Sequence, residues 1–157
     1  MATDPSQKKE ANNAYDNSIL YTDYFLDQVF QRMERLSGKA VALFLSDHGE
    51  DIFESGCVST GVTRTSRYSY EVPAFMWVNS PYLRNSPDYI AWIKSLENRK
   101  LMTQDVYPMI LKAAGIDVVG QEYPLFDNRV ERMVYGQNRW IDFDKELEKD
   151  ACVIGRR

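Results

Sequence analysis

The chain is poor in the residues and segments that would point directly to metal, redox or membrane chemistry. Its 157 residues include one histidine and two cysteines. Two cysteines allow at most one internal disulfide, and the sequence leaves open whether Cys57 and Cys152 pair. No apolar run approaches the ~18 residues that a membrane-spanning helix needs, and no N-terminal signal pattern is visible. We therefore expect this chain itself to be soluble, with no signal or transmembrane segment.

The chain also lacks an excess of positive charge. Lys and Arg number 19 against 23 Asp and Glu, for a net charge of −4. Because general nucleic-acid binding requires a basic face, we expect no nucleic-acid partner. Hydrophobic residues make up 44% of the chain, a share typical of a globular domain and not of a disordered chain. The length suits one domain with a hydrophobic core, and not two large ones.

Periodic apolar residues predict alternating helices and strands. A long helix is expected from about Tyr15 to Leu36, capped by Asn12 or Asn13. Its apolar residues are expected to form one buried stripe, consisting of Tyr15, Ile19, Leu26, Val29, Met33 and Leu36. The runs Ala40–Leu45 and Pro73–Val78 predict buried strands. Together they indicate an α/β fold.

Three further elements are expected in the second half of the chain. One helix is predicted to start at Ser86-Pro87-Asp88, where proline suits the first helical position. Another is predicted to start at Thr103 and Asp105 and to stop at Gly115. The loosely alternating stretch 129–143 predicts a hairpin around Gly136-Gln137-Asn138.

The most informative motif is Ser46-Asp47-His48-Gly49-Glu50, which directly follows the apolar run Ala40–Leu45. Asp supplies a hard oxygen and His a borderline nitrogen, a pair that suits zinc or a similar divalent ion. Gly49 is expected to adopt a positive φ and end the strand abruptly, so that both side chains converge. The alternative is an ordinary turn, with Asp47 bonded to nearby backbone N–H groups and His48 half-exposed.

Neighbouring residues offer weaker candidates for a site. Glu50 is a candidate to orient His48 through a hydrogen bond, although a plain loop carboxylate explains it equally well. Arg64 and Arg67 are candidates to clamp a phosphate with their guanidinium groups. The alternative for both arginines is a solvated charge, or a pair with Glu54 or Glu71.

Several sequence blocks carry a family resemblance. They are Ala14–Tyr24, Leu45–Glu50, Tyr70–Trp77, and Asp105–Pro108 with Ala114–Ile116. In this order they resemble the alkaline phosphatase/sulfatase superfamily, and specifically its bacterial membrane phosphoethanolamine transferases. Each block alone is weak evidence, whereas the ordered set, which spans roughly residues 12 to 116, is specific.

The resemblance implies a fold and a division of the chain. The expected fold is α/β and alkaline phosphatase-like, a mostly parallel sheet flanked by helices, present as a partial domain. We expect residues 1–11 to be a disordered segment and residues 146–157 a polar tail. Residues 12–145 are then the C-terminal part of the catalytic domain.

The resemblance also implies an activity and a cofactor. Enzymes of this family move phosphoethanolamine from a phospholipid donor to lipopolysaccharide or another envelope glycan, using a threonine nucleophile held on zinc. They are anchored in the inner membrane with the catalytic domain in the periplasm. Asp47 and His48 match two of the metal ligands by position in the motif. Zinc is the expected metal, with another divalent ion as the alternative.

Two departures from the family pattern limit what the chain is expected to do. The family's nucleophile and a further acidic ligand lie upstream of the tyrosine-rich helix, beyond where this chain begins. We therefore expect the chain alone to be inactive or nearly so. The family commonly has a second histidine where this chain has Thr60, whose hydroxyl can bind a phosphate oxygen but is a poor metal ligand. The number of metals stays open.

Other interpretations remain alongside the transferase. A sulfatase or a phosphoglycerol transferase shares the same metal block, and a non-catalytic domain that kept the scaffold would bind a protein or glycan partner. An incomplete sheet leaves an apolar edge or face uncovered. We therefore expect the chain to associate with a missing N-terminal half or with itself.

Overall fold

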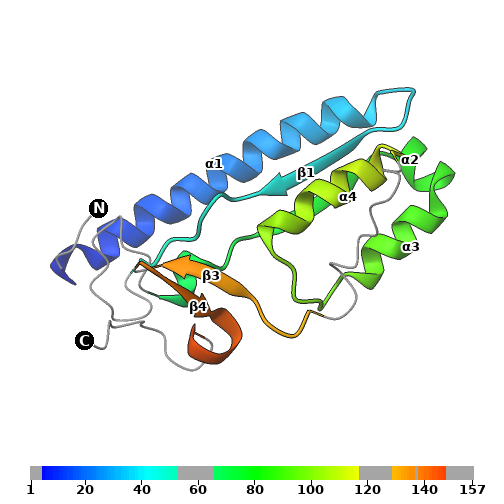
Figure 1. Ribbon diagram of the computed structural model, residues 1–157. Helices are drawn as coiled ribbons and strands as arrows, with labels where there is room; N and C mark the ends of the chain where they lie inside the picture. Colours follow the sequence, from blue (N-terminus) through cyan, green and yellow to red (C-terminus); the bar gives the residue numbers. More distant parts are fainter. Residues whose placement is uncertain (1–4, 53–65, 117–128, 137, 148–157) are drawn as a thin grey trace. The chain divides into compact units, whose positions relative to one another are not determined.

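The computed structural model describes residues 5–52, 66–116, 129–136 and 138–147 (Figure 1). The chain divides into two compact units. The first unit comprises residues 1–29, 44–74 and 133–157, and the second comprises residues 30–43 and 75–132. The units are described separately below.

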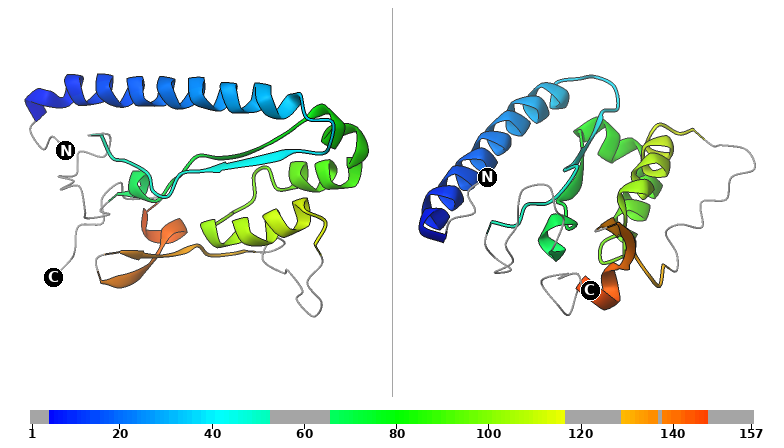
Figure 2. Two further views of the ribbon diagram at one scale, coloured as in Figure 1. Left: turned by 90° about the horizontal axis from the view of Figure 1, so that it is seen from above. Right: turned by 60° about the vertical axis from the view of Figure 1, so that its left-hand side comes forward.

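The longest element is helix α1 (Lys8–Glu34), one continuous helix that follows a short 3-10 turn at Pro5–Gln7 (Figure 2). It begins well before Tyr15, so Asn12 and Asn13 lie inside the helix and the predicted cap is wrong. The predicted buried stripe is also wrong. The structure describes the whole of α1, and none of its residues is fully buried. Of the predicted stripe, Leu26, Val29 and Met33 are half-buried, whereas Tyr15, Ile19 and Leu36 are exposed.

Strands β1 (Val41–Leu45) and β2 (Ala74–Val78) pair in a two-stranded sheet. At one end the Asn79 amide donates to the Ala40 carbonyl at 3.1 Å. At the other end the Ser46 amide donates to the Pro73 carbonyl at 3.3 Å. Residue numbers therefore run in opposite senses along the two strands, as in an antiparallel pair.

A mostly parallel sheet is thus not confirmed. Both strand pairs in the described part of the chain are antiparallel. Parallel neighbours need a crossover connection, usually a helix. The described residues between β1 and β2 contain only the 3-10 turn η2 (Arg67–Ser69). The two strands are also half-buried at most, whereas the apolar runs predicted full burial.

Asn79, at the exit of β2, is the polar centre of the second unit. Its side chain is fully buried. Its Oδ1 accepts hydrogen bonds from the backbone amides of Ala40 and Tyr82, both at 3.0 Å. Its Nδ2 donates to the carbonyls of Gly38 at 2.8 Å and Met33 at 3.4 Å. One amide group therefore joins the end of α1, the start of β1 and the first turn of α2 (Ser80–Asn85).

The same end of α1 packs against β2 within the second unit. The Phe30 ring stacks on Trp77, with centroids 4.9 Å apart and ring planes inclined by 8°. The carboxylate of Glu34 accepts a hydrogen bond from the Ser80 amide at 3.1 Å. A negative group at the N-terminus of a helix is favourable, so Glu34 supports the start of α2.

Helices α3 (Pro87–Ser95) and α4 (Val106–Ala113) begin where the sequence predicts. Pro87 and Asp88 lie in the first turn of α3, and a 3-10 turn at Thr103–Asp105 leads into α4. The Tyr89 ring packs between those of Tyr82 and Trp92, with a centroid distance of 5.5 Å to each. Burial raises the pKa of the Tyr82 and Tyr89 phenols, so both stay neutral and donate hydrogen bonds to the carbonyls of Ala113 and Met109.

Asp105 has a second role in this unit. Its side chain is almost fully buried and receives both terminal nitrogens of Arg129, at 2.6 and 2.7 Å. It also accepts a hydrogen bond from the Met102 amide at 2.7 Å. A bidentate guanidinium and a backbone amide together satisfy a carboxylate that would otherwise be costly to bury.

The predicted hairpin is confirmed in the first unit. Strands β3 (Met133–Gly136) and β4 (Arg139–Asp142) pair antiparallel, with Tyr135 opposite Trp140. Asn138 has a φ of 61°, in the left-handed region that asparagine tolerates in tight turns. The inner side of the hairpin is formed by Val134 and Ile141, which pack with Tyr70 and Phe143.

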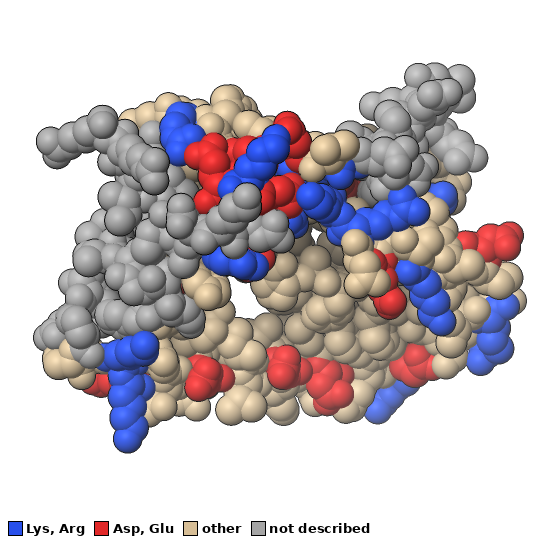
Figure 3. Space-filling model, turned by 90° about the horizontal axis from the view of Figure 1, so that it is seen from below, with Lys and Arg blue, Asp and Glu red and all other residues tan. Residues whose placement is uncertain are grey.

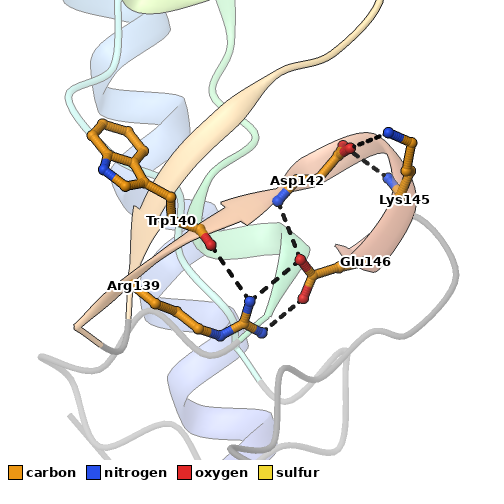
Figure 4. A network of polar contacts seen from close by, with 5 residues as sticks. All are labelled: Arg139, Trp140, Asp142, Lys145 and Glu146. Atoms are coloured by element: carbon orange, nitrogen blue, oxygen red, sulfur yellow. Dashed lines mark hydrogen bonds and ion pairs between the residues drawn. The ribbon is translucent and has the colours of Figure 1, made fainter.

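Ion pairs hold the π-helical turn Phe143–Leu147 against β4 (Figure 4). Arg139 binds Glu146 at 2.7 Å, and Lys145 binds Asp142 at 2.8 Å. Hydrogen bonds from Lys145 lower the pKa of Asp142, and those from Arg139 lower the pKa of Glu146. Both carboxylates are therefore ionised at neutral pH.

Gly49 lies just after β1. The structure requires glycine at this position, but for a different reason from the positive φ that the sequence predicts. Among the glycines in the described residues, Gly115 has a positive φ and Gly49 does not. A Cβ at Gly49 would instead overlap the backbone carbonyl oxygens of Tyr68 and Glu71. The predicted positive φ is wrong. The close approach of the η2 backbone is what requires a residue without a side chain.

We predict that Asn79→Asp lowers the free energy of unfolding by about 3 kcal/mol, because a carboxylate oxygen then faces the carbonyls of Gly38 and Met33. Urea denaturation of the purified chain measures the loss. Asn85→Asp is the matched control, since Asn85 Nδ2 also donates to a carbonyl but is exposed. Equal losses in the two variants would contradict the central role of Asn79.

We predict that Gly49→Ala destabilises the chain by about 2 kcal/mol through the overlap with the η2 backbone. Gly38→Ala is the control, because a Cβ there meets nothing within 4 Å. Thermal melts followed by circular dichroism compare the two variants. If Gly49→Ala and the unmodified chain have the same melting temperature, the close backbone approach does not constrain this position.

Candidate functional site

The turn Ser46–Glu50 is anchored from both sides within the first unit. The Ser46 amide donates to Pro73 O at 3.3 Å, and the Gly49 amide donates to Ser69 O at 3.2 Å. The Ser46 hydroxyl donates to the His48 carbonyl at 2.7 Å, closing the turn internally. The motif therefore leaves β1 as a fixed turn, as the sequence predicts for the end of this strand.

The hydrogen bonds of His48 leave one ring nitrogen free for a ligand. Its Nδ1 lies 3.1 Å from the Gly49 carbonyl oxygen. A carbonyl can only accept, so Nδ1 must carry the hydrogen, and in the neutral ring Nε2 keeps its lone pair. Glu50 Oε1 lies 3.7 Å from Nδ1, too far for a hydrogen bond but close enough to favour the protonated nitrogen.

Asp47 places its second oxygen on the same side as this free nitrogen. Oδ1 accepts a hydrogen bond from the His48 amide at 3.1 Å, and Oδ2 lies 3.9 Å from His48 Nε2. The side chains of Asp47 and His48 are 91% and 46% exposed. The Asp47–amide bond and the half-exposed ring are also what the plain-turn interpretation predicts, so both interpretations fit this geometry.

The distance between Oδ2 and Nε2 decides whether one ion can bind both. Zinc holds nitrogen and oxygen ligands at about 2.0 Å, so two ligands of a tetrahedral site lie about 3.3 Å apart. The observed 3.9 Å is slightly wider. The Asp47 side chain is 91% exposed, so packing does not oppose a shorter spacing. The two donors therefore fit two corners of a zinc site.

A third protein ligand does not lie beside them in the described residues. Within 5–52, 66–116, 129–136 and 138–147, no group of three His, Cys, Asp or Glu can hold a metal ion. Catalytic zinc usually has three protein ligands. Asp47 and His48 alone thus make an incomplete site in this part of the chain.

The remaining predicted residues fall into two groups. Arg67 is held by Glu71 through two hydrogen bonds, at 2.6 and 3.1 Å, as the ion-pair alternative predicts. Thr60 and Arg64 lie outside the described residues, as do Cys57 and Cys152. Their predicted roles stay predictions.

Ser46 was not predicted to have a role of its own, yet its hydroxyl holds the turn from inside by donating to the His48 carbonyl. A detectable signal was present, because serine at the start of a turn commonly bonds the backbone two residues further on.

Two surface features bear on the class of partner. Figure 3 shows basic and acidic side chains interspersed among the coloured residues of that face, without a continuous field of one sign. In the part of the chain that the structure describes, no helix combines the length and the hydrophobicity needed to cross a membrane.

Comparison with known proteins identifies relatives of the chain. A family model described as Sulfatase matches residues 2–116. Phosphoethanolamine transferase EptA of Helicobacter pylori is 35% identical over 77 residues, covering 48% of this chain and 15% of the relative. Kdo(2)-lipid A phosphoethanolamine 7''-transferase of Salmonella typhimurium is 30% identical over 93 residues, covering 59% and 16%. Phosphatidylethanolamine transferase Mcr-1 of Escherichia coli is 37% identical over 71 residues, covering 43% and 13%.

This chain thus spans less than a fifth of the length of each of these relatives. No solved structure gives a significant match. The family model nevertheless covers well over half of the chain, including the Asp47-His48 turn, both strands of the β1–β2 sheet and helix α4. The chain belongs to the sulfatase family, and the curated relatives named above are phosphoethanolamine transferases.

Proposed function

We propose that this chain is the part of a phosphoethanolamine transferase catalytic domain that supplies two zinc ligands. The observation that carries the proposal is the placement of Asp47 Oδ2 and His48 Nε2 3.9 Å apart at the end of a strand. The names of the relatives give the reaction class, and the turn gives a place for the ion that such chemistry uses.

The residues of this chain have distinct tasks in that proposal. Asp47 Oδ2 and His48 Nε2 hold the ion, and the Gly49 carbonyl keeps the hydrogen of the imidazole on Nδ1. The carboxylate of Glu50 lies beside Nδ1 and raises the electron density of the ring. When bound, a divalent ion lowers the pKa of a nucleophilic hydroxyl and neutralises charge on phosphoryl oxygens.

The substrates follow from the relatives as part of the same proposal. The donor is a phospholipid carrying phosphoethanolamine, and the acceptor is lipopolysaccharide or another envelope glycan. The reaction then takes place on the periplasmic side of the inner membrane. Thr60, Arg64 and Arg67 are proposed to contact the phosphate of the donor. For Arg67 this requires an exchange of the Glu71 carboxylate for the phosphate group, since each group can accept two hydrogen bonds from one guanidinium.

One observation favours a second candidate function. The described residues supply two metal donors and no third, an arrangement that also suits a domain that kept the scaffold and binds a protein or glycan without catalysis. A sulfatase or a phosphoglycerol transferase remains the alternative within the enzyme class, because the same two residues serve those reactions as well.

We predict that the chain binds zinc and that His48→Ala weakens this binding at least tenfold, which corresponds to about 1.4 kcal/mol. Isothermal titration calorimetry of the apo chain with zinc alone measures both affinities. Asp47→Asn is expected to weaken binding as well, because it removes the charge and keeps the size of the side chain. Asp88→Asn, in the first turn of α3, is the matched control and should leave the affinity unchanged. Equal zinc affinity of His48→Ala and the unmodified chain would refute the ligand role.

A second experiment distinguishes a transferase from a domain that only binds zinc. Phosphoethanolamine is expected to bind the zinc-loaded chain and not the apo chain, with its ³¹P signal broadened only when zinc is present. The His48→Ala variant should not broaden the signal at the same zinc concentration. Zinc binding without any effect on phosphoethanolamine would favour the non-catalytic alternative.

A further inference from the structure

Tyr70 connects two parts of the first unit that are far apart in the sequence. Its backbone closes the turn η2, where its amide donates to the Arg67 carbonyl at 2.9 Å. Its side chain packs against two buried residues, Ile141 of β4 and Phe143 just after that strand. The backbone of Tyr70 therefore belongs to the turn beside the candidate site, while its ring belongs to the core of the β3–β4 hairpin.

The end of β3 approaches the Tyr70 ring closely. A Cβ at Gly136 would overlap the Tyr70 hydroxyl, and it would lie 3.1 Å from Tyr70 Cζ and 3.4 Å from Ile141 Cδ1. The phenol ring is rigid and packs against the hairpin core, so its tip cannot bend away on its own. A methyl group added at Gly136 must therefore displace the whole Tyr70 side chain.

The backbone on either side of Tyr70 contacts the candidate site at Gly49. The Ser69 carbonyl accepts a hydrogen bond from the Gly49 amide at 3.2 Å. The carbonyl oxygens of Tyr68 and Glu71 lie so close to Gly49 that a Cβ there would overlap both. All three residues lie within two positions of Tyr70. A displacement of Tyr70 is thus expected to change these contacts first.

The turn η2 has few means of its own to stay at this distance from Gly49. It is three residues long, and 3-10 segments have poorer hydrogen-bond geometry than α-helices. The ion pair between Arg67 and Glu71 joins the two ends of the turn, so it keeps the shape of the turn without tying it to the hairpin. The Tyr70 ring contacts a separate element, and through this contact the hairpin determines where η2 lies.

We propose that Tyr70 is a positioning residue of the candidate site. Packed against the β3–β4 hairpin, it holds η2 against Gly49 and so fixes the carbonyl that keeps the hydrogen of His48 on Nδ1. In this role Tyr70 contacts neither the ion nor a substrate. Its effect on zinc affinity rests on the proposed function, whereas its effect on the position of the turn does not.

The test is amide hydrogen exchange of the full chain without metal, followed by NMR. The Gly49 amide reports its bond to Ser69, and the Ser69 amide, which donates to the Ser66 carbonyl at 3.1 Å, reports the integrity of η2 itself. Gly136→Ala is expected to lower the protection of Gly49 about tenfold and to leave Ser69 protected. Adding Tyr70→Phe removes the hydroxyl that the new methyl group meets, so the double variant is expected to regain the protection of Gly49.

Trp140→Ala is the matched control. It removes an aromatic ring from the same hairpin, but this ring is 64% exposed and lies on the opposite face of β4 from Ile141, so the protection of Gly49 should not change. If circular dichroism shows that Gly136→Ala does not fold, Tyr70→Leu takes its place, because leucine keeps an apolar group in the core but does not reach Gly136. Unchanged protection of Gly49 overturns the proposal. An equal loss at Ser69, or a double variant without recovery, overturns it as well.

Calorimetry with zinc alone separates this proposal from the proposed function. Gly136→Ala is expected to bind zinc about tenfold more weakly than the unmodified chain, and the double variant is expected to recover the affinity. Loss of Gly49 protection with unchanged zinc affinity would show that the turn does not set the affinity, and would overturn the positioning role. An unmodified chain that binds no zinc would instead refute the ligand roles of Asp47 and His48, while the exchange result would still decide whether Tyr70 holds the turn.

Discussion

The hydrogen bonds of one buried amide hold the second unit together. Asn79 is the point where α1, β1, β2 and α2 meet, and its side chain satisfies two donors and two acceptors there. No aspartate, serine or aliphatic residue offers both a carbonyl and an NH₂ group in one plane. The neighbouring Phe30–Trp77 stack supplies apolar contact, but the amide fixes the angle at which these segments join.

A second constraint, at the turn after β1, shapes the candidate site. The η2 backbone approaches Gly49 so closely that only glycine fits, and this contact fixes the position of the Gly49 carbonyl. That carbonyl in turn determines which nitrogen of His48 keeps its hydrogen. The position of the hydrogen on the ring, and with it the chemistry available at Nε2, is therefore set by backbone packing together with the nearby Glu50 carboxylate, while the Asp47 side chain is largely exposed.

Local sequence signals predicted local structure well. The hairpin around Asn138 and the helix start at Pro87 were predictable, because turn and capping residues act within a few positions of themselves. The turn at Asp47 and His48 was predictable for the same reason. Strand direction was not, since an apolar run reads the same in parallel and antiparallel pairs and only the connection distinguishes them. The start of α1 was missed because Lys8 to Glu10 are good helix formers without an apolar pattern.

The presence of a single histidine has a practical consequence for the study of this site. The imidazole region of a proton NMR spectrum contains signals from His48 alone, so no assignment is needed to follow it. The side chain is half-exposed, and its Nδ1 is engaged by a carbonyl. The candidate site thus carries its own spectroscopic reporter, and selective chemical modification of histidine would act at one position in the whole chain.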